Sequence, residues 1–217
     1  KLNKMHKSKG IEQKLLERIK LCQLPPLQRR SLPFECYWKD SILIQEQKHI
    51  FSNQWLGLGR ADRLETPGEY EVFELCNQSL VLIRDQNKVL RLYANTCRHR
   101  GSKLLDETGQ CQAISCPFHG WTYSLDGNLK YAKTMSENPN FDFSEHSLIE
   151  YKLKELQGFL FAFLGDQPTD LDTQLGDFSE LHQPWSLYEL VTTMREVFEV
   201  QCNWKAFLDV FNEYYHL

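Results

Sequence analysis

The sequence predicts a mainly β domain that follows N-terminal helices and precedes the beginning of an α+β domain. Between Tyr70 and Leu164, short apolar or alternating runs are separated by turn residues, which is typical of a compact antiparallel β structure. Apolar residues at helical spacing occur before this region and again near the end of the chain. With 217 residues, 41% of them hydrophobic, the chain can bury a substantial core.

Residues 1–40 are expected to form a basic tail and a peripheral helix. The first 30 residues hold nine Lys or Arg against two Glu, a net charge of +7 in a chain whose formal charge is −4. Apolar residues recur at helical spacing before a proline pair that ends the helix: Ile11, Leu15 and Ile19, then Pro25 and Pro26. A second helix is expected from Ser41 to about Trp55, capped by Asp40.

The β domain is expected to span residues 41–165. Its predicted strands include SLVLIR, VLRLYA, WTYSL, LIEYKL and FLFAFLG, and Asp126-Gly127 predicts a hairpin turn. Residues 166–187 are rich in Asp, Gly, Pro and Gln, so they are interpreted as a linker that wraps the surface.

Residues 188–217 are expected to begin a second domain. Phe198, Val200 and Cys202 alternate with polar residues, which predicts a strand. A helix should follow, because apolar residues then recur at its period: Trp204, Phe207, Leu208, Phe211 and Tyr215. About 30 residues are too few to bury the core of a domain, so this domain is expected to be incomplete.

Composition narrows the possible partners and compartment. The formal charge is −4, and no run of about 18 apolar residues occurs in the sequence. Neither a nucleic-acid partner nor a membrane partner is therefore indicated. Seven cysteines spread along the chain do not resemble a disulfide framework, so a reducing, cytoplasmic location is expected. The chain opens on Lys1 without a signal-peptide pattern, and its ends are interpreted as trimmed.

The segment TCRHRGSKLLDETGQCQAISCPFHGW carries the chemistry. It contains Cys97-x-His99 and Cys116-x-x-His119, separated by sixteen residues, so that two loops each offer one thiolate and one imidazole. Such a set can hold a two-iron two-sulfur cluster with both Cys on one iron and both His on the other. Neutral imidazoles raise the reduction potential relative to an all-Cys site, which suits the transfer of single electrons.

Two other metal sites compete with this interpretation. A Cys2His2 zinc site normally pairs Cys with Cys and His with His, whereas this chain alternates the two residue types. Cys111 and Cys116 match the plant-type ferredoxin spacing until His119 occupies the third position, so Cys111 is interpreted as a bystander.

The two ligand loops resemble the Rieske signature of ring-hydroxylating oxygenase large subunits, in the segments NTCRHRG and CPFHGWTYSLDG. The segments that precede the signature are similar as well: IFSNQWLGLGRADRL, PGEYEVFEL and VLIRDQNKVLRLYAN. Respiratory and photosynthetic Rieske proteins carry a disulfide cysteine in each loop, where this chain has Ser102 and Phe118. The resemblance implies a Rieske domain of the iron–sulfur-protein type, followed by a helix-grip, START-like catalytic domain that is truncated here.

The tail QCNWKAFLDVFNEYYHL is similar to the NWK…E-x-x-H opening of oxygenase catalytic domains. The resemblance implies that His216 is the first ligand of a 2-His-1-carboxylate mononuclear Fe(II) site. It also implies that Glu213 is the acidic residue that bridges to a cluster-bound His of a neighbouring subunit. The remaining two ligands would lie beyond residue 217.

The resemblance implies an oxygenase that takes electrons from a reductase or ferredoxin and uses O2 to hydroxylate or demethylate a small organic substrate, either an aromatic ring or a quaternary amine. A homotrimer or a multiple of it, with or without a small subunit, is expected. A Rieske electron carrier without an oxygenase site and a structural zinc module are the alternatives. Arg98 and Arg100 are candidates for either donor docking or ion pairs within the loop, and Trp121 is expected to pack beneath it.

Overall fold

The computed structural model describes residues 13–212, which divide into two compact units. The larger unit comprises residues 47–195, and the smaller combines residues up to Glu46 with residues from Glu196 onward. In the part of the chain that is described, no helix has both the length and the apolar character needed to cross a membrane.

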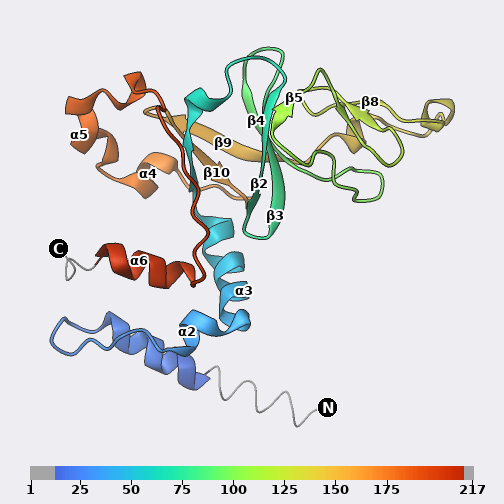
Figure 1. The fold of residues 1–217 in the computed structure, drawn as a ribbon. Coiled ribbons are helices and arrows are strands. Elements are labelled where there is room, and N and C mark those ends of the chain that lie inside the picture. Colours follow the sequence, from blue (N-terminus) through green and yellow to red (C-terminus); the bar gives the residue numbers. More distant parts are fainter. Residues whose placement is uncertain (1–12, 213–217) are drawn as a thin grey trace, which may run out of the picture. The chain divides into compact units, whose positions relative to one another are not determined.

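The larger unit is built on a seven-stranded antiparallel sheet in the order β1-β10-β9-β4-β3-β2-β5 (Figure 1). Its strands are β1 (Leu56–Arg60), β2 (Glu69–Leu75), β3 (Gln78–Arg84), β4 (Leu90–Ala94), β5 (Gly109–Gln110), β9 (Glu150–Leu156) and β10 (Phe159–Phe163). Four strands expected from SLVLIR, VLRLYA, LIEYKL and FLFAFLG are confirmed as β3, β4, β9 and β10. The pairing of β4 with β9 leaves a long insertion between them, and this insertion carries a second sheet.

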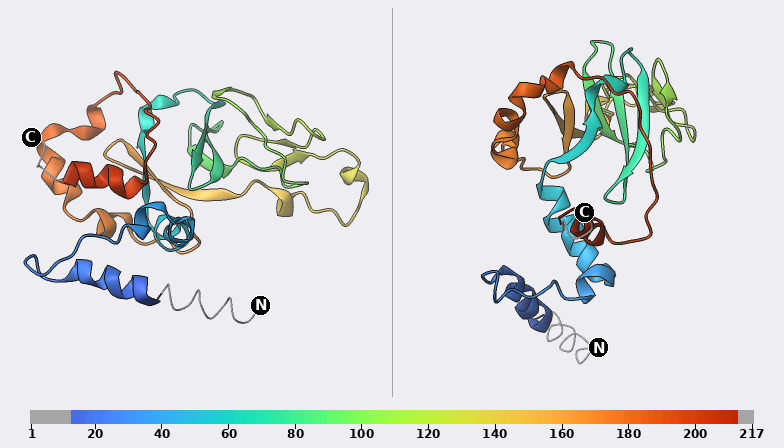
Figure 2. Two further views of the ribbon diagram at one scale, coloured as in Figure 1. Left: turned by 60° about the horizontal axis from the view of Figure 1, so that its bottom comes forward. Right: turned by 60° about the vertical axis from the view of Figure 1, so that its left-hand side comes forward.

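The second sheet has three strands in the order β6-β7-β8 and lies at one end of the large sheet, where the chain is coloured green to yellow (Figure 2). Its strands are β6 (Ile114–Ser115), β7 (Thr122–Tyr123) and β8 (Leu129–Tyr131). Asp126 and Gly127 connect β7 to β8, which confirms the predicted hairpin. The strand expected from WTYSL is confirmed as β7.

Strand β3 separates two hydrophobic cores. Leu80 and Leu82 face a core that includes residues of β4 and β10, while Val81 and Ile83 face a core shared with the small sheet. All four side chains are at most 1% exposed, so the strand is buried on both faces. Burial on both faces explains why SLVLIR is a nearly continuous apolar run.

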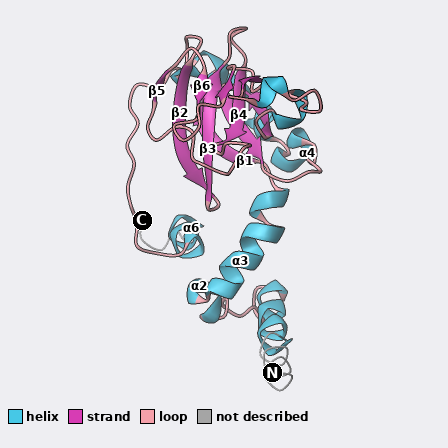
Figure 3. Ribbon diagram, turned by 90° about the vertical axis from the view of Figure 1, so that its right-hand side faces the viewer, coloured by secondary structure: helices cyan, strands magenta, loops and turns pink. Residues whose placement is uncertain are grey.

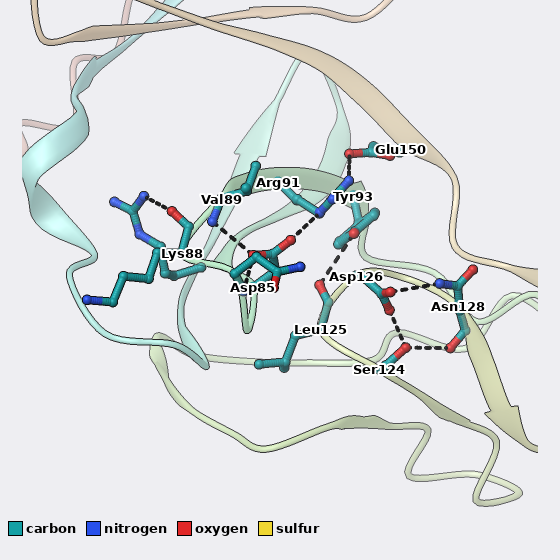
Figure 4. A network of polar contacts seen from close by, with 12 residues as sticks. Asp85, Lys88, Val89, Arg91, Tyr93, Ser124, Leu125, Asp126, Asn128 and Glu150 are labelled. Atoms are coloured by element: carbon teal, nitrogen blue, oxygen red, sulfur yellow. Dashed lines mark hydrogen bonds and ion pairs between the residues drawn. The ribbon is translucent and has the colours of Figure 1, made fainter.

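A buried carboxylate ties the β3–β4 turn to β9 (Figure 4). Asp85 is 0% exposed and accepts hydrogen bonds from the backbone N–H groups of Asn87 and Val89, each at 2.8 Å. Arg91 donates to Asp85 at 2.7 Å through Nε and to Glu150 at 3.0 Å through Nη1. Both oxygens of the buried carboxylate thereby accept hydrogen bonds from donors that the fold supplies.

Residues 166–187, expected as a linker, contain two short helices, α4 (Leu171–Leu175) and α5 (Phe178–His182). Asp170 caps α4 by accepting a hydrogen bond from the N–H of Thr173 at 2.9 Å. Leu171 is 2% exposed and packs with Trp55, the residue before β1, and with Phe163 of β10. Leu175 packs against the same cluster, and the side-chain amide of Gln174 accepts from the N–H of Trp55 at 2.9 Å and donates to its carbonyl at 3.0 Å. Apolar contacts and hydrogen bonds together hold this polar stretch against the domain.

Residues 187–195 form an extended strap without regular structure after Glu189, and side chains of the sheet region hold it. Arg60 donates to the carbonyl oxygens of Leu187 and Leu190. Asp62 accepts hydrogen bonds from the N–H of Thr192 at 2.6 Å and from its hydroxyl at 2.9 Å. Arg195 pairs with Glu71 of β2 at 2.6 Å, so the strap is fixed at both ends.

The smaller unit is helical in the part that is described (Figure 3). Residues 13–20 are helical and continue into a 3-10 turn, and further helices are α2 (Glu35–Trp38), α3 (Asp40–His49) and α6 (Trp204–Asn212). Short 3-10 turns elsewhere are η1 (Leu21–Gln23), η2 (Phe51–Asn53), η3 (Ala61–Arg63), η4 (Met135–Glu137), η5 (Ser144–His146), η6 (Gln183–Trp185) and η7 (Leu187–Glu189).

Two expectations for the helical segments need correction. The helix expected to reach Trp55 ends at His49, and Asp40 is its first residue rather than its cap. The strand expected at residues 198–202 is wrong, because these residues have no regular structure. Alternation of apolar residues marks a strand only where a neighbouring strand supplies hydrogen bonds, and none of the described strands pairs with this segment. The helix expected from Trp204 is confirmed as α6 over its described length.

Candidate metal centre

Cys97 and Cys116 each begin a loop with the same pattern of backbone hydrogen bonds. The N–H of Cys97 donates to the carbonyl of Ser102 at 2.8 Å, and the N–H of Gly101 donates back to Cys97 at 3.0 Å. The second loop repeats both bonds, at 2.8 Å from Cys116 to Trp121 and at 3.0 Å from Gly120 to Cys116. Two similar turns therefore present the paired Cys and His residues.

Both turns require a left-handed residue at their fifth position. Gly101 has φ of +72° and Gly120 has φ of +70°, a conformation that other L-residues adopt only with strain. An added Cβ would meet nothing within 4 Å at either position, so the requirement comes from the backbone and not from crowding.

The two loops bury their thiols and leave their imidazoles near the surface. Cys97 is 2% exposed and Cys116 is 4% exposed, whereas His99 is half-buried and His119 is exposed. The two imidazole rings lie 4.7 Å apart between centroids. The four predicted ligand residues therefore lie together, with sulfur on the inside and nitrogen on the outside.

The environment of Cys116 favours a thiolate. Burial alone would raise the pKa of this thiol, but the backbone N–H groups of Phe118 and His119, the Cys97 thiol and the Ser102 hydroxyl donate to it and hold the pKa below its ordinary value. Burial raises the pKa of Cys97, its partner. Backbone amides aimed at sulfur suit a ligand that binds metal as a thiolate.

His99 has the form that a metal ligand needs. Burial, followed by the neighbouring His119, lowers the pKa of His99, which favours the neutral imidazole. Its Nδ1 is buried and has no hydrogen-bond partner among the described residues. Its ring stacks on Trp121 with 4.9 Å between centroids and 10° between planes. Trp121 is 4% exposed, which confirms that it packs beneath the loop.

The hydroxyl of Tyr123 reaches the buried side of the site. Tyr123 is 0% exposed, and its Oη lies 3.3 Å from Sγ of Cys97 and accepts a hydrogen bond from the N–H of Arg98 at 3.0 Å. Burial raises the pKa of Tyr123 far above its ordinary value, with a further contribution from Cys97, so the phenol keeps its proton.

A cavity of about 520 Å³ opens over the two imidazoles. Its lining combines ring surfaces with two cationic side chains: His99, Arg100, Phe118, His119, Trp121, Lys133, Thr134 and Met135. The nitrogen side of the site therefore faces a surface depression, whereas the sulfur side faces the core.

The donor set fits a two-iron cluster better than a single ion. Within residues 13–212, no three His, Cys, Asp or Glu side chains gather as the ligands of one metal ion would. A Rieske cluster takes only two protein ligands per iron, with bridging sulfides completing each coordination sphere. The site meets that requirement, because it offers two thiols on the core side and two imidazoles on the surface side, and Nδ1 of His99 has no hydrogen-bond partner among the described residues.

Comparisons with known proteins agree with this geometry. The family model of the Rieske [2Fe-2S] domain matches residues 54–150. The carnitine monooxygenase oxygenase subunit of Acinetobacter pittii (strain PHEA-2) is 32% identical over 189 residues, which are 86% of this chain and 51% of that protein. Residues 54–150 are a Rieske [2Fe-2S] domain, and the chain is similar to Rieske oxygenase subunits. The cofactor of its Rieske domain is a two-iron two-sulfur cluster.

Other relatives extend the comparison. The glycine betaine monooxygenase oxygenase subunit of Chromohalobacter salexigens is 30% identical, over 86% of this chain and 42% of that protein. The apo structure of the quaternary ammonium Rieske monooxygenase CntA aligns with a TM-score of 0.80 and 32% identity, over 86% of this chain and 55% of that one. Naphthalene 1,2-dioxygenase from Rhodococcus sp., at 24% identity and a TM-score of 0.70, shares the fold over 80% of this chain and 40% of its own. The chain spans about half the length of the curated relatives it matches.

The NWK segment has a structural role in the smaller unit. Asn203 caps α6 by accepting a hydrogen bond from the N–H of Lys205 at 3.1 Å. Trp204 Nε1 and Lys205 Nζ both donate to Glu46, at 3.0 and 2.8 Å. Sequence reasoning missed Glu46, since nothing near it in the chain marks it. Glu213 and His216, the other predicted site residues of this tail, lie outside the described residues.

Sequence reasoning also missed the contacts of Tyr123 and His146 with the Rieske site. His146 meets Trp121 at 5.7 Å and Phe141 at 4.4 Å between ring centroids. A usable signal existed for Tyr123, because Trp121 and Tyr123 alternate with polar residues and must share the inner face of one strand.

Proposed function

We propose that Cys97, His99, Cys116 and His119 are the cluster ligands, with both cysteines on one iron and both histidines on the other. The main observation behind this proposal is that two buried thiols lie beside two imidazoles near the surface, and that Nδ1 of His99 is buried without a hydrogen-bond partner among the described residues. When bound, the cluster accepts and passes on single electrons at a moderate potential.

The residues around the site prepare it for that task. Backbone amides stabilise the thiolate of Cys116, and stacking on Trp121 orients the ring of His99. The core on the sulfur side excludes water, while the cavity over His99 and His119 leaves the nitrogen side open to a partner.

We further propose that the complete protein is an oxygenase component. It receives electrons from a reductase or ferredoxin and delivers them to a mononuclear Fe(II), where O2 hydroxylates or demethylates a small organic substrate. His216 is the first ligand of that iron, Glu213 bridges to a cluster-bound His of a neighbouring subunit, and the assembly is a homotrimer or a multiple of it. Relatives named for carnitine, glycine betaine and choline favour a quaternary amine over an aromatic ring as the substrate.

The domain division forms part of this proposal. Residues 41–165 are the Rieske domain, residues 166–187 connect it, and residues 188–217 begin the catalytic domain. Exposed apolar side chains in the last segment support the assignment, since they suit a core that further chain would complete: Val197, Phe198, Val200, Phe207 and Phe211. A cytoplasmic location is supported by the seven cysteines, none of which forms a disulfide in the described part of the chain.

Metal analysis tests the ligand set. The purified chain should contain about two irons and two acid-labile sulfides, and substitution of any one ligand, for example Cys116→Ser or His119→Ala, should abolish the cluster. Cys111→Ser is the matched control, because Cys111 lies in the same region outside the ligand set and should leave the cluster intact. Loss of the cluster in the Cys111→Ser variant alone, or zinc without sulfide in the wild type, would contradict the assignment.

The oxygenase proposal has its own test. Full-length protein should hold about one further iron per chain and should consume O2 when a quaternary amine such as carnitine or glycine betaine is supplied with a reductant. An electron carrier, the alternative function, predicts about two irons per chain and no substrate-dependent O2 uptake.

A further inference from the structure

The two ligand loops differ in how they are closed, although their turns share the same backbone hydrogen bonds. The second loop runs directly into the ladder between β6 and β7, which closes it with two successive backbone pairs. The first loop has only an isolated bridge in the described part of the chain, between Thr96 and Lys103. The next step of the first loop is therefore closed by something other than strand pairing.

The side chain of Asn95 takes the place of the missing ladder step. Its Oδ1 accepts hydrogen bonds from the N–H of Leu104 at 3.2 Å and from that of Leu105 at 3.0 Å. Its Nδ2 donates to the carbonyl of Leu105 at 2.6 Å and to the hydroxyl of Ser79 at 3.2 Å. A side-chain amide has two acceptor positions and two donor hydrogens, so Asn95 uses all four.

The amide of Asn95 is enclosed and anchored. Asn95 is 1% exposed, and Leu104, whose N–H donates to it, is 5% exposed. The backbone N–H of Asn95 donates to the carbonyl of Ser79 in β3 at 2.9 Å, which ties this position to the large sheet. A buried backbone group that loses its partner is strongly unfavourable, because water does not replace the lost hydrogen bond. Opening of the first loop must therefore break a set of buried hydrogen bonds that a single side chain makes.

We propose that the side-chain amide of Asn95 locks the first ligand loop, and that opening of this loop sets how long the site retains its cluster. The inference rests on the ligand set proposed above. Each loop supplies one Cys and one His, so opening of the first loop withdraws one ligand from each iron. The second loop stays closed longer, because its ladder is made by the backbone. Asn95 is a positioning residue, because it acts through Cys97 and His99.

The test compares Asn95→Ala with Asp85→Asn in the cluster-containing chain. Asp85 is the matched control, because it is also a buried polar residue with several hydrogen bonds but lies between β3 and β4, outside the ligand loops. An excess of an iron chelator is added, and the loss of the cluster is followed by visible absorption and electron paramagnetic resonance.

Asn95→Ala should lose its cluster at least about tenfold faster than the wild type, because it leaves three backbone groups of Leu104 and Leu105 unpaired. Asp85→Asn should change the rate of cluster loss by less than about twofold even though it lowers Tm, because its hydrogen bonds are independent of the loop. A purely structural role for Asn95 predicts instead that cluster loss follows Tm in both variants.

Hydrogen exchange in the wild-type chain covers the case in which Asn95→Ala fails to fold. As the chelator removes iron, the amide hydrogens of Leu104 and Leu105 should exchange faster before those of Ile114 and Tyr123, which pair in the ladder of the second loop. Faster exchange at Ile114 and Tyr123 first would overturn the proposal, since the second loop would then be the one that opens.

The outcomes separate this inference from the function on which it depends. A wild-type chain without iron and sulfide would contradict the proposed ligand set. An intact cluster that wild type and Asn95→Ala lose at the same rate would overturn the role of Asn95 alone. An equal acceleration in Asp85→Asn would also overturn it, since the cause would then be general destabilisation of the larger unit.

Discussion

Replacing Asp85 by Asn should destabilise the larger unit strongly, although Asp85 lies outside the ligand loops. The carboxylate is 0% exposed and accepts three hydrogen bonds of 2.7 to 2.8 Å, one of them from Arg91. Asn removes the charge and turns an NH2 group toward donors. A hydrogen bond to a charged group contributes about 1.5–3 kcal/mol, and loss of one partner leaves Arg91 half-paired, so a cost of about 2–4 kcal/mol is expected.

That cost corresponds to a fall of roughly 5–15 °C in Tm for a unit of this size. Thermal unfolding followed by circular dichroism, on samples matched for iron content, measures it. Asp126→Asn is the control, because Asp126 also accepts side-chain hydrogen bonds but is exposed, and it should cost under about 1 kcal/mol. Equal losses of Tm in the two variants would refute the argument that burial of the charge decides the cost.

The effect of Asp85 should depend on pH with a defined sign. Burial opposes ionisation, but the hydrogen bond from Arg91 and the amides of Val89 and Asn87 outweigh it and hold the pKa of Asp85 below its ordinary value. A depressed carboxyl pKa stabilises the fold above about pH 4 and ceases to do so as the pH falls through the folded-state pKa. The Tm difference between wild type and Asp85→Asn should therefore be constant near neutral pH and shrink in acid.

Three further predictions concern the loops, the strap and the cluster. Gly120→Ala should cost about 1–2 kcal/mol from its φ of +70° alone, measured by the same thermal unfolding, and Gly57→Ala, where φ is not positive, should cost little. Glu71→Gln should accelerate tryptic cleavage after Arg195 several-fold, because loss of the Glu71–Arg195 ion pair releases the strap. Glu74→Gln is the control, because Glu74 is exposed on the same strand, and it should leave the cleavage rate unchanged. Equal cleavage rates in the two variants would contradict the role of the ion pair. Chelation of iron should leave the far-ultraviolet circular dichroism of the sheet largely intact, because the core around Leu80 and Leu160 contains no candidate ligand. Amide hydrogen exchange in residues 97–121 should become faster, because these residues form the ligand loops.

The strands and the ligand loops were accessible from sequence because each is encoded locally. β3 is an apolar run, and each Cys-His pair lies within a turn that ends in glycine. Contacts between distant residues were not accessible: Glu46 meets Lys205 across 159 positions, and Tyr123 meets Cys97 across 26. The strand expected at Phe198 failed for a related reason, since a pattern can mark one strand but cannot supply its neighbour.

The register of the large sheet carries a consequence for the order of folding. β1 pairs with β10, so that Leu56 meets Ala162 and closure of the sheet must bring together segments about 100 residues apart. Cys97 and Tyr123, whose contact joins the first ligand loop to β7, are instead only 26 apart in the chain. Local contacts form before distant ones. We therefore expect the metal-binding end to form while the large sheet is still open, and the pairing of β1 with the local β9–β10 hairpin to complete the sheet last.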